Sequence, residues 1–253
     1  MALVTLAHDA AIATITLDSP ENRNALSAAL MDELDAHLSA VADDPAVRAV
    51  VLTHTGPTFC AGADLREAAE GGMERGTHRL LEILRKIIEL PVPVLAHLRG
   101  NARAGGLGLV GASDLAVAPA DTTFAFSEVR LGLAPAIISL TTLPRLDPRA
   151  ASRYFLTGEA FDGAEAERIG LITLAGPGIE GADAHAADLI ANLRLGSRQG
   201  LVATKKLLAA TLAERVAEGG AATVRLSADL FGSEEAAEGM AALRERRRPS
   251  WVG

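Results

Sequence analysis

Two short segments of the chain, residues 61–65 and 104–108, are rich in glycine and alanine. Each follows an apolar stretch that predicts a strand, and each leads into a predicted helix. Small side chains let a ligand approach the backbone closely. The first N–H groups of a helix have no partner within the helix and lie at the positive end of its dipole. Two such junctions directed at one point could stabilise a negatively charged oxygen, as an oxyanion hole does.

Other interpretations of these segments remain open. Either segment alone is more often a tight turn where a helix packs closely on a strand. Gly106, Gly108 and Gly111 also match the spacing of the dinucleotide-binding fingerprint, with Glu128 near the position of its ribose-binding acid. The strand predicted over residues 92–98 ends several residues before the first fingerprint glycine, which disfavours this match. A nicotinamide-dependent oxidoreductase is therefore a remote alternative.

The elements that must position these segments alternate between strands and helices. Two short strands are predicted over residues 2–6 and 11–17 around a turn at His8-Asp9, and apolar runs at 48–52 and 92–98 predict buried strands. Leucines at every fourth residue from Leu26 to Leu38 predict a helix. From residue 146 the pattern is mainly helical, with breaks at Thr157-Gly158, Gly176-Pro177-Gly178 and Gly219-Gly220. This order predicts an α/β core over residues 1–195 and a helical C-terminal region over residues 196–253.

Composition limits the class of protein. The 253 residues are 49% apolar, enough for a sizeable core. A net charge of −8 and only 3% aromatic residues disfavour nucleic acid as a partner. One cysteine, Cys60, rules out an intrachain disulfide, and the six histidines show no metal-site spacing. No secretory signal and no run of about 18 apolar residues is visible, so we expect a cytoplasmic protein with no membrane partner.

Five motifs in order along the chain resemble those of the crotonase (enoyl-CoA hydratase/isomerase) family. They are Asn24-Ala25-Leu26-Ser27, residues 59–65 (FCAGADL), residues 100–114, residues 126–135 (FSEVRLGLAP) and residues 238–247. The resemblance covers nearly the whole chain. It implies an α/β fold, a crotonase-like spiral of ββα units with a helical C-terminal region, and assembly as a homotrimer or homohexamer.

The resemblance also implies a site for an acyl-CoA or enoyl-CoA. The backbone N–H groups of Ala63 and Gly105 would hold the thioester oxygen, and Glu128 would be the catalytic acid–base group. The residues expected to contact the substrate are Ala61, Arg66, Gly106, Gly108, Pro135 and Arg246. No metal and no separate cofactor are expected, because coenzyme A is part of the substrate.

One position departs from the family pattern. Family hydratases typically use two glutamates, and Gly108 stands at the first of these positions. Our leading hypothesis is an enoyl-CoA hydratase that adds water across the 2,3-double bond with Glu128 as its one carboxylate. A Δ3-to-Δ2 enoyl-CoA isomerase is the first alternative, because one carboxylate can move a proton from C2 to C4. A non-catalytic acyl-CoA-binding protein is the second.

The residues near these motifs allow further expectations. Phe124, Phe126 and Leu131 would desolvate Glu128 and raise its pKa, whereas the alternative is an ordinary strand-end carboxylate paired with Arg130. Asp114 is interpreted as a buried loop anchor. Cys60 is interpreted as a small buried thiol with no partner base.

Overall fold

The computed structural model describes residues 2–64, 66–67 and 73–253. Its main sheet has the strand order β1-β2-β3-β5-β7-β10. These strands are β1 (Val4–Asp9), β2 (Ile12–Leu17), β3 (Ala49–His54), β5 (Val94–His97), β7 (Leu115–Pro119) and β10 (Leu174–Gly176). Strand β1 is antiparallel to β2, and all other neighbours are parallel. Parallel neighbours need a crossover connection, usually helical.

A second, smaller sheet lies at the ends of the main strands. Its order is β4 (Thr58–Cys60), β6 (Asn101–Arg103), β8 (Thr123–Ala125) and β9 (Phe161–Asp162), with only β9 antiparallel to its neighbour. Each of β3, β5 and β7 runs directly into one strand of this sheet, and a helix follows. This repeat is the spiral of ββα units expected from the resemblance.

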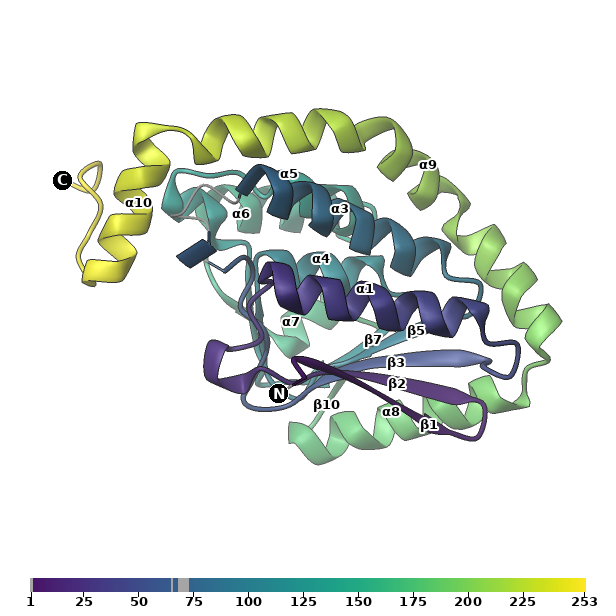
Figure 1. The fold of residues 1–253 in the computed structure, drawn as a ribbon. Coiled ribbons are helices and arrows are strands. Elements are labelled where there is room, and N and C mark those ends of the chain that lie inside the picture. The colour runs from purple at the N-terminus through teal and green to yellow at the C-terminus, as the bar shows by residue number, and fades with distance from the viewer. Residues whose placement is uncertain (1, 65, 68–72) are drawn as a thin grey trace.

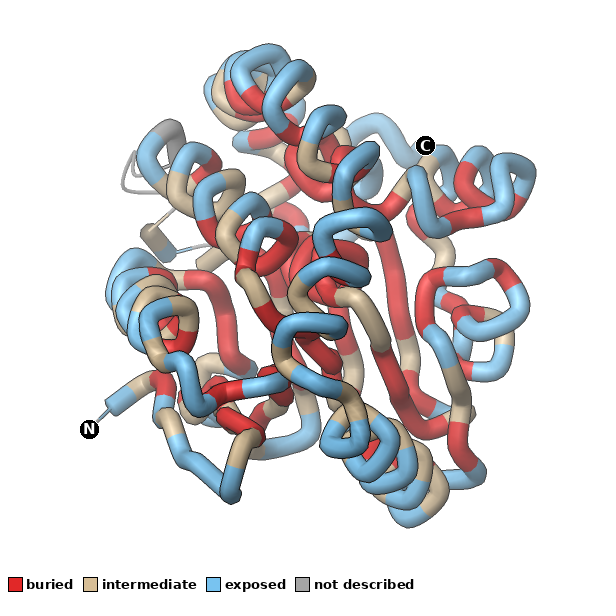
Figure 2. Tube along the Cα trace, turned by 90° about the vertical axis from the view of Figure 1, so that its right-hand side faces the viewer, coloured by how far each residue is buried: buried red, intermediate tan, exposed pale blue. Residues whose placement is uncertain are grey.

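Helices cover both faces of the main sheet (Figure 1). One face carries α1 (Ala28–Asp43), α3 (Met73–Glu89) and α4 (Gly105–Ala112), and the other carries α8 (Gly178–Leu195). Helix α1 forms as predicted, with its leucines buried on one side and the Ser27 side chain accepting a hydrogen bond from the Leu30 N–H. On the opposite face, Ala186 of α8 belongs to a separate apolar cluster with strand residues. Figure 2 shows the resulting division between a buried interior and exposed outer helix surfaces.

The remaining helical elements are distributed along the chain. They are η1 (Pro20–Asn22), η2 (Ser127–Leu131), α5 (Ala136–Thr142), α6 (Pro148–Thr157), α7 (Gly163–Arg168), α9 (Arg198–Phe231) and α10 (Glu234–Glu245). The predicted breaks at Thr157-Gly158 and at Gly176-Pro177-Gly178 are confirmed, since α6 ends at Thr157 and α8 begins at Gly178.

Two local predictions are wrong. Gly219-Gly220 does not break α9, because both glycines give neighbouring side chains close access to the helix. A Cβ at Gly219 would lie 2.7 Å from Leu140 Cδ2, and one at Gly220 would lie 2.8 Å from Leu81 Cδ2. Residues His8-Asp9 belong to β1, and the chain turns at Ala10, which has a φ of 51°. The division of the chain at residue 195 stays a prediction, although α8 ends there.

Candidate active site

The two glycine-rich junctions meet in the folded chain. Gly62 follows β4 and has a φ of +91°, a conformation that favours glycine. A Cβ at this position would lie 2.8 Å from the Ala104 Cβ and 3.3 Å from the Gly105 nitrogen. The backbones are therefore in direct contact, as the sequence interpretation required. Leu65, the last residue of the first junction, lies outside the described residues.

Two backbone N–H groups at this contact are available to a ligand. Ala63 and Gly105 both line a cavity of about 460 Å³. Neither N–H donates a hydrogen bond to another residue of the described chain. Gly105 is the first residue of α4, where N–H groups lack an intrahelical partner. Ala104 before it adopts φ 46° and ψ −120°, a rarely populated conformation that non-glycine residues adopt mainly at functional sites.

Glu128 lines the same cavity from η2. Burial raises the pKa of its carboxyl from 4.5 to about 7, and a hydrogen bond from its own backbone N–H opposes this rise. Its Oε2 is buried and has no hydrogen-bond partner in the described chain. The alternative ion pair with Arg130 does not form, because the Arg130 Nε donates to the Thr157 carbonyl oxygen instead.

The three apolar residues expected to desolvate Glu128 lie in different parts of the structure. Leu131 lines the cavity, but Phe124 and Phe126 are not among its lining residues. Both phenylalanines are fully buried in an aromatic cluster, where the Phe126 ring lies 4.3 Å from that of Phe155 and the Phe124 ring 5.8 Å from that of Phe161. They therefore support the strand before Glu128 rather than the cavity wall.

Two other described carboxylates line the cavity, and both already have partners. Asp64 accepts hydrogen bonds from the Asn22 side chain at 2.8 Å and from the Arg66 N–H at 2.9 Å. Glu67 accepts one from the Ala28 N–H at 2.9 Å. Glu128 combines a buried oxygen that has no hydrogen-bond partner with a raised pKa, whereas the pKa of Asp64 is lowered, so Glu128 is the best candidate for proton transfer.

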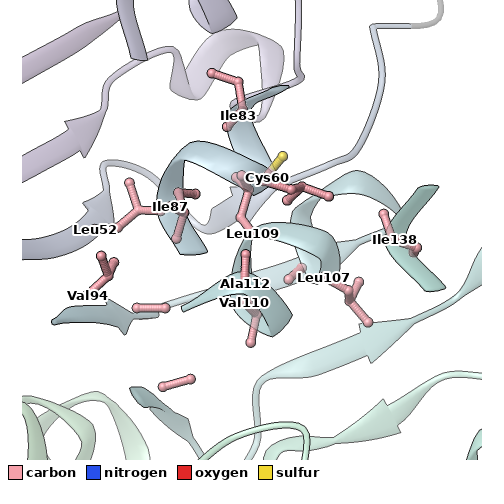
Figure 3. Close-up of a cluster of buried hydrophobic side chains, with 14 of the residues drawn as sticks. Leu52, Cys60, Ile83, Ile87, Val94, Leu107, Leu109, Val110, Ala112 and Ile138 are labelled. Atoms are coloured by element: carbon pink, nitrogen blue, oxygen red, sulfur yellow. The ribbon is translucent and has the colours of Figure 1, made fainter. Parts of the chain in front are cut away.

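Ile138 of α5 covers the backbone at Gly108. A Cβ at Gly108 would lie 2.7 Å from Ile138 Cγ2 and 3.4 Å from Leu84 Cδ1. The Thr141 hydroxyl donates to the Gly108 carbonyl oxygen at 3.1 Å and so ties the two helices together. Figure 3 shows Ile138 beside Leu107 of α4. Ile138 lines the cavity whereas Gly108 does not, so an apolar side chain occupies the space next to the position of the first family glutamate.

The other predicted substrate-contact residues divide into two groups. Ala61, Arg66 and Pro135 line the cavity. Gly106 and Arg246 do not. A Cβ at Gly106 would lie 2.8 Å from the Cys60 carbonyl oxygen, so this glycine packs against β4. Arg246 is exposed at the end of α10, and its contact with a substrate stays a prediction.

The sequence interpretation missed several lining residues. Ser227 and Phe231 near the end of α9 border the cavity, and no motif marks them; Leu243 of α10 also borders it and lies in the motif at residues 238–247, but it was not singled out. Arg103 also lines it. Its guanidinium donates to the Ala102 carbonyl oxygen at 2.8 Å and to the Thr123 hydroxyl at 2.6 Å, and it forms no ion pair with a described carboxylate. Burial lowers the pKa of Arg103.

Two expectations about supporting residues are confirmed. Asp114 anchors its loop by accepting a hydrogen bond from the Val94 N–H at 2.7 Å and by pairing with the buried Lys205 Nζ at 2.9 Å. Cys60 is fully buried, and desolvation raises the pKa of its thiol to about 12, which disfavours a nucleophilic role. In the described part of the chain, no group of three or more His, Cys, Asp and Glu side chains could hold a metal ion. No described helix is long and apolar enough to cross a membrane.

Comparisons with known proteins agree with this geometry. The model of the enoyl-CoA hydratase/isomerase family matches residues 7–253. A "probable enoyl-CoA hydratase" from Rhodobacter capsulatus is 35% identical over 96% of this chain and 95% of its own length. A relative from Thermus thermophilus with a similar name is 33% identical over 94% and 96%. The crystal structure of an enoyl-CoA hydratase from Mycobacterium avium superposes with a TM-score of 0.92, at 48% identity and with both chains fully covered.

Proposed function

Because the chain belongs to the enoyl-CoA hydratase/isomerase family, we propose that it is an enoyl-CoA hydratase that adds water across the 2,3-double bond of an enoyl-CoA thioester. The observation that carries this proposal is one buried carboxylate in the same cavity as two unpaired N–H donors. Glu128 supplies the carboxylate, and Ala63 and Gly105 supply the donors. The names of the relatives support the same reaction.

The first step forms an enolate. The thioester oxygen accepts hydrogen bonds from the Ala63 and Gly105 N–H groups. Ionised Glu128 takes a proton from a water molecule while the water oxygen bonds to C3. The electron pair of the double bond moves through C2 to the thioester oxygen, where the two donors stabilise the new negative charge. Removing one such donor typically costs about 10²–10³ in rate.

The second step returns the proton. Protonated Glu128 donates to C2 while the enolate collapses to the thioester, which leaves a 3-hydroxyacyl-CoA and regenerates the carboxylate. One group must therefore act first as a base and then as an acid. A pKa of about 7 suits this double role near neutral pH, because both protonation states are well populated.

A Δ3-to-Δ2 enoyl-CoA isomerase is the second candidate, and the packing of Ile138 over Gly108 favours it. Isomerisation needs only one carboxylate, which removes a proton from C2 and returns it at C4. It needs no activated water. The oxyanion donors would serve the same enolate.

The absorbance of the conjugated enoyl thioester separates the two reactions. A hydratase removes this band from 2-enoyl-CoA esters, and we expect this loss with crotonyl-CoA, longer enoyl-CoAs or 3-methylglutaconyl-CoA. Appearance of the band from 3-enoyl-CoA, without loss from any 2-enoyl-CoA, would assign the isomerase. Binding of these esters without any absorbance change would contradict both reactions and favour a non-catalytic acyl-CoA-binding protein.

The assembly remains part of the proposal. Leu207 and Leu208 on α9 are 80% and 75% exposed, and a homotrimer or homohexamer could cover such side chains.

A further inference from the structure

The 3-10 helix that carries Glu128 is in direct backbone contact with α10 through two glycines. A Cβ at Gly132, whose φ is +71°, would lie 2.7 Å from the carbonyl carbon of Glu235. A Cβ at Gly239 would lie 2.5 Å from the carbonyl oxygen of Leu131. Backbone atoms cannot yield as a flexible side chain can. Neither position therefore has room for one additional methyl group unless α10 moves away from η2.

Gly132 links this contact to Glu128. The N–H groups of Gly132 and Leu133 both donate hydrogen bonds to the Glu128 carbonyl oxygen, the second at 3.0 Å. Gly132, which is in backbone contact with α10, therefore also holds the backbone of Glu128 in place. A displacement of α10 would be transmitted to Glu128 through these bonds.

Helix α10 also borders the cavity in which the Glu128 carboxylate lies. Leu243 of α10 lines it, together with Phe231 at the end of α9. Figure 1 shows α10 turning back from the end of α9. The same helix therefore contacts the backbone next to Glu128 and supplies an apolar side chain to the cavity that the Glu128 side chain lines.

Burial, and not a neighbouring charge, causes the raised pKa of Glu128. The raised pKa comes from desolvation, opposed only by the glutamate's own backbone N–H. The described charged groups that share the cavity, or that lie on η2, α10 and α6, are Arg23, Asp64, Arg66, Glu67, Arg103, Arg130, Glu234, Glu235, Glu238, Arg244, Glu245, Arg149 and Arg153. None of them forms an ion pair with Glu128.

We propose that α10 is a positioning element of the active site, and that its docking on η2 through Gly132 and Gly239 keeps the Glu128 carboxylate buried in the cavity. This inference rests on the proposed function of Glu128 as the acid–base group. Displacement of α10 admits water to the carboxylate and returns its pKa toward the ordinary value.

The test is Gly239→Ala, with Gly232→Ala as its matched control. Gly232 immediately precedes α10's cap, its φ is −78°, and the nearest atoms to a Cβ there lie 3.6 Å away. Alanine has a higher helix propensity than glycine, so the Gly239→Ala substitution does not destabilise α10 through helix propensity. Two quantities are measured for each variant: the pH dependence of kcat/KM, and the titration of the Glu128 carboxyl by infrared difference spectroscopy with Glu128→Gln as the reference.

Gly239→Ala should lower the pKa by about one unit or more in both measurements and reduce kcat about tenfold. Gly232→Ala should leave both unchanged. An unshifted pKa in folded Gly239→Ala, or an equal shift in the control, would overturn the proposal. If Gly239→Ala does not fold, Ala242→Gly loosens α10 without adding an atom and should shift the pKa in the same direction. An unshifted pKa in that variant would also overturn it.

The infrared titration does not depend on turnover. An inactive wild type with a shifted carboxyl titration in Gly239→Ala would refute the proposed function and leave the positioning role standing. An active wild type together with an unshifted carboxyl titration in Gly239→Ala would leave the proposed function standing and refute the positioning role.

Discussion

Gly108→Ala places one methyl group against Ile138, and its effect can be worked out from the packing. The new Cβ would lie 2.7 Å from Ile138 Cγ2 and 3.3 Å from Ile138 Cβ. Overpacking of a core costs about 1–3 kcal/mol. Replacing glycine by alanine inside a helix gains about 1 kcal/mol. The net loss in the free energy of unfolding should therefore be about 0–2 kcal/mol.

A double-mutant cycle isolates the contact. Ile138→Ala removes Cγ2 and should cost about 2–5 kcal/mol by itself. The double variant should be less destabilised than the sum of the single variants by about 1–3 kcal/mol, because the clash at position 108 disappears with the isoleucine. Denaturant unfolding of the four proteins measures these values. Additivity within about 0.5 kcal/mol would refute the reasoning that Ile138 occupies this space.

The same pair has a functional consequence. In the Ile138→Ala background, Gly108→Glu should be tolerated and should supply a second carboxylate beside the substrate. Hydration of crotonyl-CoA should then be about 10²-fold faster than in Ile138→Ala alone. An equal rate in the two proteins would mean that position 108 does not face the reacting carbons.

The remaining predictions concern proton transfer, the oxyanion donors and the buried ion pair. Glu128 has a raised pKa in the folded state, so its contribution to stability is present below pH about 4.5 and is lost as the pH rises through about 7. The free energy of unfolding of Glu128→Gln, measured with denaturant, should therefore equal that of the wild type at pH 4 and exceed it by up to about 3 kcal/mol above pH 8. Equal free energies of unfolding at both pH values would contradict the burial argument. Gly105→Pro should reduce kcat/KM about 10²–10³-fold beyond Gly105→Ala, which adds a Cβ but keeps the N–H, and similar rates in the two would exclude this donor. Lys205→Met leaves Asp114 without its buried cation and should cost about 3 kcal/mol of unfolding free energy, whereas a loss below about 1 kcal/mol would show that the pair contributes little.

The parts of the site that follow from local backbone chemistry could be predicted from the sequence. Glycine and alanine after a strand predicted both junctions, and their contact at Gly62 and Gly105 agrees with that interpretation. The raised pKa of Glu128 was also predicted in direction, since apolar neighbours in sequence indicated burial. Periodic leucines predicted α1 for the same reason, because the pattern repeats within one element.

The parts that depend on contacts between distant residues could not be predicted. Strands β4, β6 and β9 have two or three residues each, too few for an alternating pattern, and they form only because their neighbours in the small sheet are present. The role of Ile138 was invisible because it lies 30 positions from Gly108 in the chain. The glycines of α9 were misinterpreted as a break because nothing local distinguishes a helix-ending glycine from one that admits a neighbouring side chain.

Turnover and product binding by Glu128→Gln test the central claim most directly. Glutamine keeps the size and hydrogen-bonding capacity of the side chain but cannot take a proton from water. We expect kcat for hydration of the best 2-enoyl-CoA to fall about 10²–10⁴-fold while the Kd of the product 3-hydroxyacyl-CoA stays within about twofold of the wild-type value. Unchanged turnover in a folded Glu128→Gln protein would contradict the account, because the reaction would then proceed without its proposed acid–base group.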